Sequence, residues 1–428
     1  MSPERQKHNL IRYPSDRVKF ENPQSDLERL PGVHFLTVDL TPDSLKNRIQ
    51  PLEIHIAEIE PRINGKVISA DQWLNNEFFF DQRHRAEDGI IIHTGTHIGK
   101  RSLKEPLSIA LALSIRDQIA HTEERQRIVV VSAEFGQAAN SLLDLMDQYG
   151  LNQKEIEGLD INRHFIGLFD TPKNPIEEFT QNYMRFLLSR YGLLKGLFLD
   201  LHSDPTEHLI SPYAILDRTV ALEEKSRYWA VVTKLFKNIS VVWDLEDKTY
   251  KREGLDCSLT AKMLEGLGGA LTSLIPVTIE CSAGDMDAED LSFMEDTILQ
   301  AMERHKIILL TKREKIMREP TANSCFWDGK KENQQLRRQW MPIVISDSGI
   351  VAIDGHVLGK VIEKGGKIGE VIATDYPPRD PTSIIAPNQC YILGVPPVDI
   401  IEAKNHTIYI SVVVPERQDL DQKSVCQY

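Results

Sequence analysis

The sequence has little positive charge relative to its acidic content. Its 50 lysine and arginine residues are outnumbered by 63 aspartate and glutamate residues, which gives a formal net charge of −13 at pH 7. Nucleic-acid binding needs a basic face that neutralises phosphates, and electrostatic attachment to anionic membranes needs clustered lysine and arginine. We therefore expect neither a nucleic-acid nor a membrane partner. An acidic substrate is still allowed, provided that individual arginines bind it.

Long apolar runs and paired cysteines are also missing. No apolar run approaches the roughly 20 residues that a membrane-spanning helix needs. The polar stretch 1–16 has none of the apolar core of a secretory signal. The five cysteines are scattered and form no Cys-x-x-Cys pair, which is typical of reduced thiols and argues against a thiolate zinc site. These absences predict a cytoplasmic protein in which histidines and carboxylates would hold any metal ion.

The apolar residues that are present predict an α/β fold. Alternating patterns within 33–60 predict strands at a sheet edge. Continuous apolar runs, typical of strands buried between helix layers, occur at 89–93, 128–131, 196–199 and 275–279. Helical patterns lie between these runs at 106–120 and 174–192, and another follows the last run at 291–302. Together they predict a mixed, mostly parallel sheet with helices on both faces.

The pattern of apolar residues and glycines in the sequence changes near Ser324. Residues 342–415 are short β runs separated by glycine-rich turns, which predicts a small all-β domain. We therefore expect three parts: an N-terminal extension with edge strands over 1–60, an α/β domain over 61–325, and a β-rich C-terminal domain over 326–428.

Candidate metal ligands follow the first buried run. Gly95-Thr96-His97 comes directly after it, and Glu105 opens the next predicted helix. Histidine and glutamate are common zinc ligands. The alternative is that His97 forms a hydrogen bond within a turn and that Glu105 stabilises a helix N-terminus. His93, inside the run, is a spare candidate that we expect instead to be a sheet histidine.

The run at 196–199 leads into Asp200-Leu201-His202. Alternate residues of a strand point to the same face, so Asp200 could orient His202 or a neighbouring group. We predict that His202 is a zinc ligand. The alternative is a capped strand end followed by a turn at Ser203-Asp204-Pro205.

Two further polar motifs have a chemical interpretation. Asn162 and Arg163, within 160–165, offer an amide and a planar fork of donors that suit a carboxylate; the alternative is a solvated turn. Glu280 ends the run at 275–279, where a partly desolvated glutamate can accept a proton from zinc-activated water. The alternative is a salt-bridged glutamate at a strand end.

The order of these motifs resembles the succinylglutamate desuccinylase/aspartoacylase family, relatives of the zinc carboxypeptidases. The family's motifs run Gly-x-His-Gly-x-Glu-Pro, Asp-Leu-Asn-Arg-x-Phe, Asp-Leu-His and Thr-x-Glu, and a β-rich domain follows. The matching segments, within 88–415, are Gly95-Thr96-His97, Glu105-Pro106, Asp160-Ile161-Asn162-Arg163-His164-Phe165, Asp200-Leu201-His202 and Thr278-Ile279-Glu280.

The resemblance implies a zinc hydrolase whose catalytic domain is residues 61–325. It implies one Zn²⁺ held by His97, Glu105 and His202, with a fourth position open. It also implies that Glu280 acts first as general base and then as general acid.

The resemblance further implies the class of substrate. Asn162 and Arg163 would hold the carboxylate of a small N-acyl amino acid, and the chain would be a zinc-dependent amidohydrolase that removes the acyl group. Two alternatives stay open: a zinc carboxypeptidase acting on peptide C-termini, and a non-catalytic pseudo-enzyme that serves as a binding module. A homodimer is also left open.

The chain departs from the family's motifs in two places. The family spaces its histidine and glutamate ligands three residues apart, whereas here Lys100 occupies that position and Glu105 comes later. We interpret 98–104 as carrying an insertion; the alternative is that Lys100 replaces the ligand and repels zinc. The family's oxyanion arginine is missing from its usual place, so that oxyanion stabilisation falls to zinc alone, Lys154 or Arg252.

Overall fold

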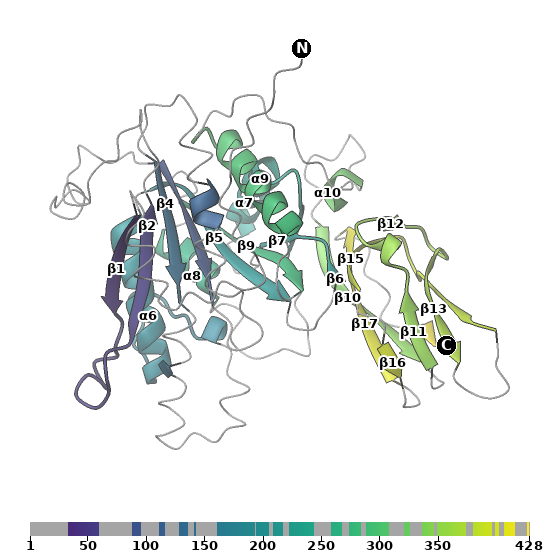
Figure 1. Cartoon of the computed structure of the whole chain (residues 1–428), viewed down its shortest axis with the longest axis horizontal. Helices are drawn as coiled ribbons and strands as arrows, with labels where there is room; N and C mark the ends of the chain where they lie inside the picture. Colours follow the sequence, from purple (N-terminus) through teal and green to yellow (C-terminus); the bar gives the residue numbers. More distant parts are fainter. Residues whose placement is uncertain are drawn as a thin grey trace, which may run out of the picture.

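The chain consists of a long mixed sheet with helices on both faces, and of a smaller sheet beside the far end of the long one (Figure 1). The computed structural model describes residues 33–59, 88–95, 111–115, 128–135, 141–142, 161–192, 194–204, 209–216, 222–243, 258–267, 274–283, 288–307, 321–325, 336–345, 349–373, 380–395, 399–401, 406–415 and 426–427.

Four parallel strands form the centre of the long sheet. Their order is β4 (Ile128–Glu134), β3 (Asp88–Thr94), β5 (Lys195–Asp204) and β9 (Leu274–Ala283). These strands contain the four apolar runs of the sequence, and their apolar side chains are buried on both faces. The predicted fold class, a mixed and mostly parallel sheet between helices, is confirmed.

Antiparallel strands flank this centre on both sides. On one side β2 (Glu53–Ile59) pairs with β4, and β1 (Val33–Asp39) forms the outer edge. On the other side β7 (Tyr213–Leu216) runs antiparallel to β9, and β8 (Ser240–Trp243) runs parallel to β7.

The helices lie in two layers. The helices α6 (Pro175–Tyr191) and α8 (Leu259–Gly266) contribute to the apolar cluster on one face of the sheet. The helices α7 (Leu222–Leu235) and α9 (Ala288–Arg304) pack against the other face. A further helical stretch at 111–115 supplies buried residues to this second layer, within the predicted helix 106–120.

The ends of α6 follow from its sequence. The side-chain oxygen of Asn174 accepts hydrogen bonds from the backbone N–H groups of Ile176 (3.0 Å) and Glu177 (2.9 Å), and Pro175 occupies the first turn. At the other end, the Gly192 N–H donates to the carbonyl oxygen of Leu188. A Cβ at Gly192 would lie 2.4 Å from that oxygen, so the helix closes there only with glycine.

The C-terminal region is built from strands, as predicted. The long sheet continues through β10 (Leu336–Ile345), β17 (His406–Pro415), β15 (Cys390–Val395) and β12 (Val361–Ile362), with β6 (Leu209–Ile210) and β18 (Cys426–Gln427) paired alongside. The smaller sheet has the order β14 (Thr382–Ile385), β13 (Lys367–Ala373), β11 (Gly349–Ile353) and β16 (Asp399–Ile401). Two short helices, α10 (Ala322–Cys325) and η7 (Gly355–Val357), lie in this half of the chain.

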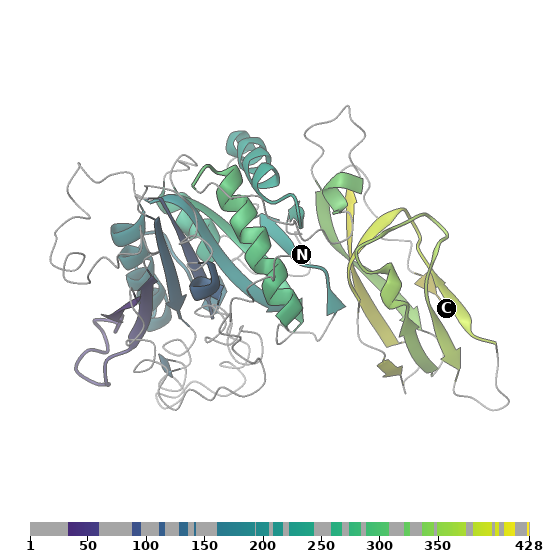
Figure 2. The same ribbon diagram turned by 45° about the horizontal axis from the view of Figure 1, so that its top comes forward.

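The C-terminal strands lie beside the α/β part (Figure 2) and are joined to it by backbone pairing. Arg337 of β10 pairs with Trp243 of β8, and β15 pairs with β6. Four buried residues of the C-terminal half belong to the same apolar core as α7 and α9; these are Leu336, Tyr391, Leu393 and Val413. The predicted domain boundaries after 60 and 325 adjoin residues outside the described ranges and stay predictions.

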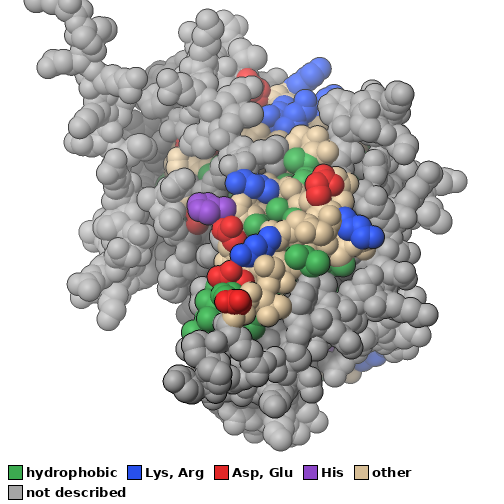
Figure 3. All heavy atoms as spheres, turned by 90° about the vertical axis from the view of Figure 1, so that its right-hand side faces the viewer, with side chains coloured by type: hydrophobic (Ala, Val, Ile, Leu, Met, Phe, Trp, Pro, Cys, Tyr) green, Lys and Arg blue, Asp and Glu red, His purple; other side chains and the backbone are tan. Residues whose placement is uncertain are grey.

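The outer face of the C-terminal region carries both signs of charge. Figure 3 shows lysine and arginine side chains interspersed with aspartate and glutamate on the described part of this face. In the C-terminal region, Lys367 of β13 forms an ion pair with Glu370 of the same strand at 2.8 Å. In the described part of the chain, every helix is too short or too polar to cross a membrane.

Candidate active site

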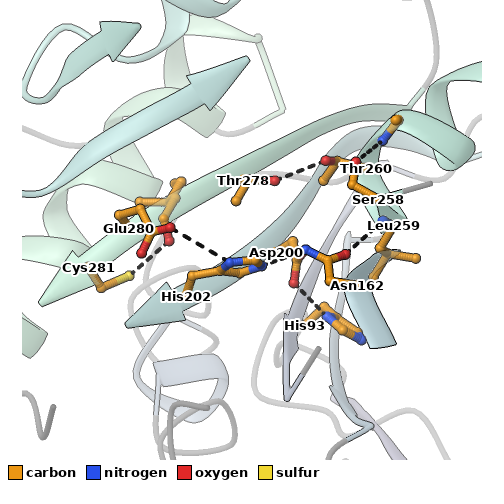
Figure 4. A network of polar contacts seen from close by, with 12 residues as sticks. His93, Asn162, Asp200, His202, Ser258, Leu259, Thr260, Thr278, Glu280 and Cys281 are labelled. Atoms are coloured by element: carbon orange, nitrogen blue, oxygen red, sulfur yellow. Dashed lines mark hydrogen bonds and ion pairs between the residues drawn. The ribbon is translucent and has the colours of Figure 1, made fainter. Parts of the chain in front are cut away.

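Strand register brings three of the polar strand ends together. His93 of β3 pairs with Asp200 of β5, and His202 of β5 pairs with Glu280 of β9. Residues directly opposite each other in a sheet point to the same face, as do alternate residues of one strand. The four side chains therefore form a row across the carboxyl ends of β3, β5 and β9 (Figure 4).

Asp200 is the centre of this row. It is completely buried, and its two carboxylate oxygens contact the Nδ1 atom of His93 and the Nε2 atom of His202, each at 2.8 Å. Burial alone would raise the pKa of Asp200, but the two imidazoles lower that pKa below its usual range. Asp200 is therefore ionised and can only accept, so both imidazoles donate an N–H to it.

The orientation of His202 follows from this contact. Because its Nε2–H donates to Asp200, the neutral ring carries its lone pair on Nδ1. Nδ1 lies 3.8 Å from an oxygen of Glu280, and the two side chains are 4% and 14% exposed. The other Glu280 oxygen is buried and makes no hydrogen bond with the described residues. His202 and Glu280 thus present acceptor atoms toward one another at this separation.

A β-bulge follows the His202–Glu280 pair directly. Ser203 pairs with Ser282, so Cys281 is the extra residue on β9. The Cys281 thiol is buried and donates to the carbonyl oxygen of Ile279. Burial and the neighbouring charge of Glu280 raise the pKa of this thiol well above its usual value. Cys281 is therefore protonated and poorly suited to nucleophilic attack.

His93 lies inside the sheet among aromatic rings. Its side chain is fully buried, and its ring centroid lies 5.6–5.8 Å from those of Phe135, Tyr183 and Phe198. Its Nε2 atom has no hydrogen-bond partner among the described residues. This position is that of a sheet histidine, as expected for it.

Asn162 ties a neighbouring loop to a helix N-terminus. It lies in the short helix η4 (Ile161–Arg163), is buried, and accepts a hydrogen bond from the Leu259 N–H at the start of α8 (3.0 Å). Ser258 caps the same helix, and the hydroxyls of Thr260 and Thr278 join it to β9 at 2.9 Å. The amide predicted to bind substrate is thus already fixed by the backbone of α8.

The remaining predicted residues lie outside what the structure describes. His97, Lys100 and Glu105 lie outside the described residues, in the stretch that follows Gly95. Lys154 and Arg252 also lie outside the described ranges. Of Arg163, only the backbone is described. Within the described ranges, no group of three or more histidine, cysteine or carboxylate side chains could by itself hold a metal ion. The structure therefore brings together His202, Asp200 and Glu280, and the predictions for the other ligands stay predictions.

The described donor atoms nonetheless fit a zinc ion. A histidine ligand whose second nitrogen donates to a carboxylate is the usual arrangement in zinc sites, and His202 with Asp200 has this form. The Glu280 oxygen that has no hydrogen-bond partner among the described residues offers a proton acceptor beside it.

Known proteins resemble this chain in structure rather than in sequence. No family model matches the sequence, and no curated protein matches it. An aspartoacylase family protein from Mesorhizobium loti is 14% identical, with 90% of this chain and 96% of that one covered and a TM-score of 0.50. The chain has the fold of the succinylglutamate desuccinylase/aspartoacylase family. The resemblance predicted from the motifs is thereby confirmed at the level of the fold.

Two further structures support this assignment of the fold. A succinylglutamate desuccinylase/aspartoacylase from Rhodobacter sphaeroides is 12% identical, covers 91% of this chain and 97% of its own, and has a TM-score of 0.50. A protein from Shewanella frigidimarina described in the same terms is 10% identical, with 91% and 100% covered and a TM-score of 0.52. Each match spans the α/β part and the C-terminal strands together.

One contact of the site could not be predicted from its motif. Sequence reasoning paired Asp200 with His202, which is two residues away, but did not connect Asp200 with His93. One signal could have indicated this contact. The runs 89–93 and 196–199 are of similar length, and each ends at or next to a polar residue, so that pairing them as neighbouring parallel strands places those polar residues opposite each other.

Proposed function

We propose that this chain is a zinc-dependent amidohydrolase that removes the acyl group from a small N-acyl amino acid. The observation that carries the proposal is the row formed by Asp200, His202 and Glu280 at the ends of β5 and β9. The fold, shared with desuccinylase/aspartoacylase structures, supports the same class of reaction.

The residues that would hold the ion are His202 together with His97 and Glu105. Bound there, Zn²⁺ would polarise the acyl carbonyl and lower the pKa of a water molecule. Asp200 contributes by fixing the tautomer of His202, because its ionised carboxylate accepts the Nε2–H.

Glu280 would move the proton in this reaction. Its buried oxygen has no competing donor among the described residues, so its lone pairs are available to accept a proton from water. The protonated carboxyl can then give the same proton to the leaving nitrogen. Asn162 and Arg163 would hold the substrate carboxylate, which keeps the amide at the reacting groups.

Replacement of Glu280 tests its role. Removing an acid–base carboxylate costs at least about a hundredfold in kcat. We expect the Glu280→Gln variant to show this loss on whichever member of an N-acyl amino acid panel releases most free amine. The matched control is Glu370→Gln, at the surface of the C-terminal region, with unchanged kcat. Near-full activity of Glu280→Gln would refute the assignment.

Metal analysis separates the enzyme from the pseudo-enzyme. We expect about one equivalent of zinc per chain in carefully purified protein, and loss of activity with a chelator. Well under one equivalent, with no recovery on adding divalent ions, would favour a binding module. Peptides with free C-termini belong in the same panel, because preferential cleavage of these would favour a carboxypeptidase.

The proposal includes a cytoplasmic location. Cys281, Cys325 and Cys390 form no disulfide bond. Cysteines outside disulfides, two of them buried, suit a reducing compartment.

A further inference from the structure

We infer that His93 is a positioning residue for the metal site, which acts on His202 through Asp200. The inference rests on the proposed function, because His202 is one of the zinc ligands proposed there. His93 is not a predicted ligand itself, but it would help to hold His202 in place. His93 lies on β3 and His202 on β5, so the contact joins two neighbouring strands through one shared carboxylate.

The geometry gives each oxygen of Asp200 one imidazole. Oδ1 accepts from His93 and Oδ2 accepts from His202, both at 2.8 Å. A carboxylate held at one oxygen can still rotate about its Cβ–Cγ bond, whereas one held at both oxygens has a fixed plane. His93 therefore helps to fix the direction from which Asp200 meets Nε2 of His202, and with it the direction in which Nδ1 points.

The surroundings of His93 show that packing does not explain a histidine there. The ring is fully buried and borders Phe135, Tyr183 and Phe198, so an apolar aromatic ring would suit the same space. Burying an imidazole costs free energy unless its polar atoms form hydrogen bonds, and one nitrogen of His93 has no such partner among the described residues. The contact with Asp200 is the feature that offsets this cost.

The chemical consequence concerns the tautomer of His202. A neutral imidazole can place its proton on either nitrogen, and only the Nε2–H form leaves Nδ1 free as a ligand atom. Loss of the His93 contact would remove one of the hydrogen bonds that fix the plane of the Asp200 carboxylate, so His202 would spend more time in the wrong tautomer or orientation. Partners of this kind typically change metal affinity 10- to 100-fold.

The test compares two replacements of His93. His93→Phe keeps an aromatic ring but removes the donor, while His93→Asn places an amide N–H near the position of Nδ1. Zinc affinity is measured by competition with a chromogenic chelator. We expect a loss of about 10- to 100-fold in His93→Phe and a return to within about threefold of the wild type in His93→Asn. If His93→Phe does not fold, His93→Leu replaces it, because leucine also lacks a hydrogen-bond donor.

Phe135→Leu is the matched control. It disturbs the same aromatic group, in which Phe135 stacks on Tyr183 at 4.6 Å, but leaves both hydrogen bonds to Asp200 in place. We expect it to lower stability without changing zinc affinity. Equal losses of affinity in Phe135→Leu and in the donor-free variant would show that packing alone is responsible and would overturn the inference.

A second measurement is independent of zinc and of activity. In the metal-free protein labelled with ¹⁵N-histidine, nitrogen chemical shifts report which ring nitrogen of His202 carries the proton; a His202→Asn spectrum assigns the signals. We expect the Nε2–H form in the wild type and a mixture in the donor-free variant. An unchanged tautomer together with unchanged affinity would overturn the inference. If the wild type binds no zinc, the proposed function fails, but the tautomer result still decides the role of His93.

Discussion

Lys306 adopts a backbone conformation that its residue type disfavours. It follows α9 with a φ of 64°, and the Ile307 N–H behind it donates to the carbonyl of Met302, as in a glycine-type helix end. We predict that Lys306→Gly stabilises the protein by about 1 kcal/mol, because glycine enters this region without a Cβ clash. Urea unfolding followed by circular dichroism measures the change. Lys306→Ala is the control, since it keeps the Cβ; an equal gain there would contradict the explanation.

At the scale of residues, the sequence predicted what is encoded locally. Asp200 and His202 stand two apart on one strand, so their shared face follows from the strand period alone. Glu280 was assigned a place at a strand end in the same way. The contact of His93 with Asp200 depends on the register between two strands more than a hundred residues apart in sequence, and no local pattern contains that register.

At the scale of elements, the contact between β3 and β5 has one very close approach. Gly89 pairs with Gly196, and a Cβ at Gly196 would lie 1.7 Å from the carbonyl oxygen of Gly89. We predict that Gly196→Ala prevents folding or lowers stability by more than about 4 kcal/mol, since backbone atoms cannot move aside without breaking the strand pair. Soluble yield and the thermal midpoint are the measurements.

Gly167→Ala is the matched control for this change. There the added Cβ would meet the carboxylate end of Asp170 at 2.8 Å, and a side-chain end can shift at small cost. A Gly196→Ala variant as stable as this control would show that the two strands can separate.

The helix α6 is tied to β2, the second strand of the sheet, by a buried carboxylate. Glu58 of β2 accepts two hydrogen bonds from Arg190 (2.6 and 3.0 Å) and one from the Tyr191 hydroxyl (2.6 Å). We predict that Arg190→Met destabilises the protein by about 3 kcal/mol, because it leaves a buried charge without its cation. Chemical denaturation measures this. Arg185→Met, on an exposed position of the same helix, should cost under about 1 kcal/mol; similar losses in both variants would contradict the explanation.

The elements that could be predicted share a strong local signal. The central strands are apolar on both faces, and α6 begins with a polar cap followed by proline. Sequence reasoning assigned no element to 209–243, although β6, β7, α7 and β8 lie there. The strands among these are two to four residues long, which is too short for any periodicity. They are held by pairing with other strands: β6 with β15, β7 with β9, and β8 with β7 and β10.

At the scale of the whole molecule, the α/β part and the C-terminal region share one apolar core. Leu336, Tyr391, Leu393 and Val413 are buried in the same cluster as α7 and α9. We predict that a chain ending at residue 325 is insoluble or unfolded, because it exposes the apolar surface that these residues cover. The full chain should unfold in a single calorimetric transition. Two separated transitions, or a folded and monomeric 1–325 fragment, would contradict this.

The composition of the sequence predicts the β-rich C-terminal region but not how this region joins the rest of the chain. The change of pattern near Ser324 correctly predicted a β-rich C-terminal region. Composition does not show that Arg337 continues the sheet beyond Trp243, because that pairing joins strands far apart in sequence.

The continuous sheet also constrains how the protein can move. Enzymes with two parts often admit substrate by rotation about a hinge, in which the linking segment alone changes conformation. Here such a rotation would break the pairing of β10 with β8 and of β15 with β6, and would open an apolar interface. We therefore expect the C-terminal region to keep its position relative to the α/β part when a substrate binds. Small-angle scattering should accordingly give the same radius of gyration with and without a bound substrate analogue.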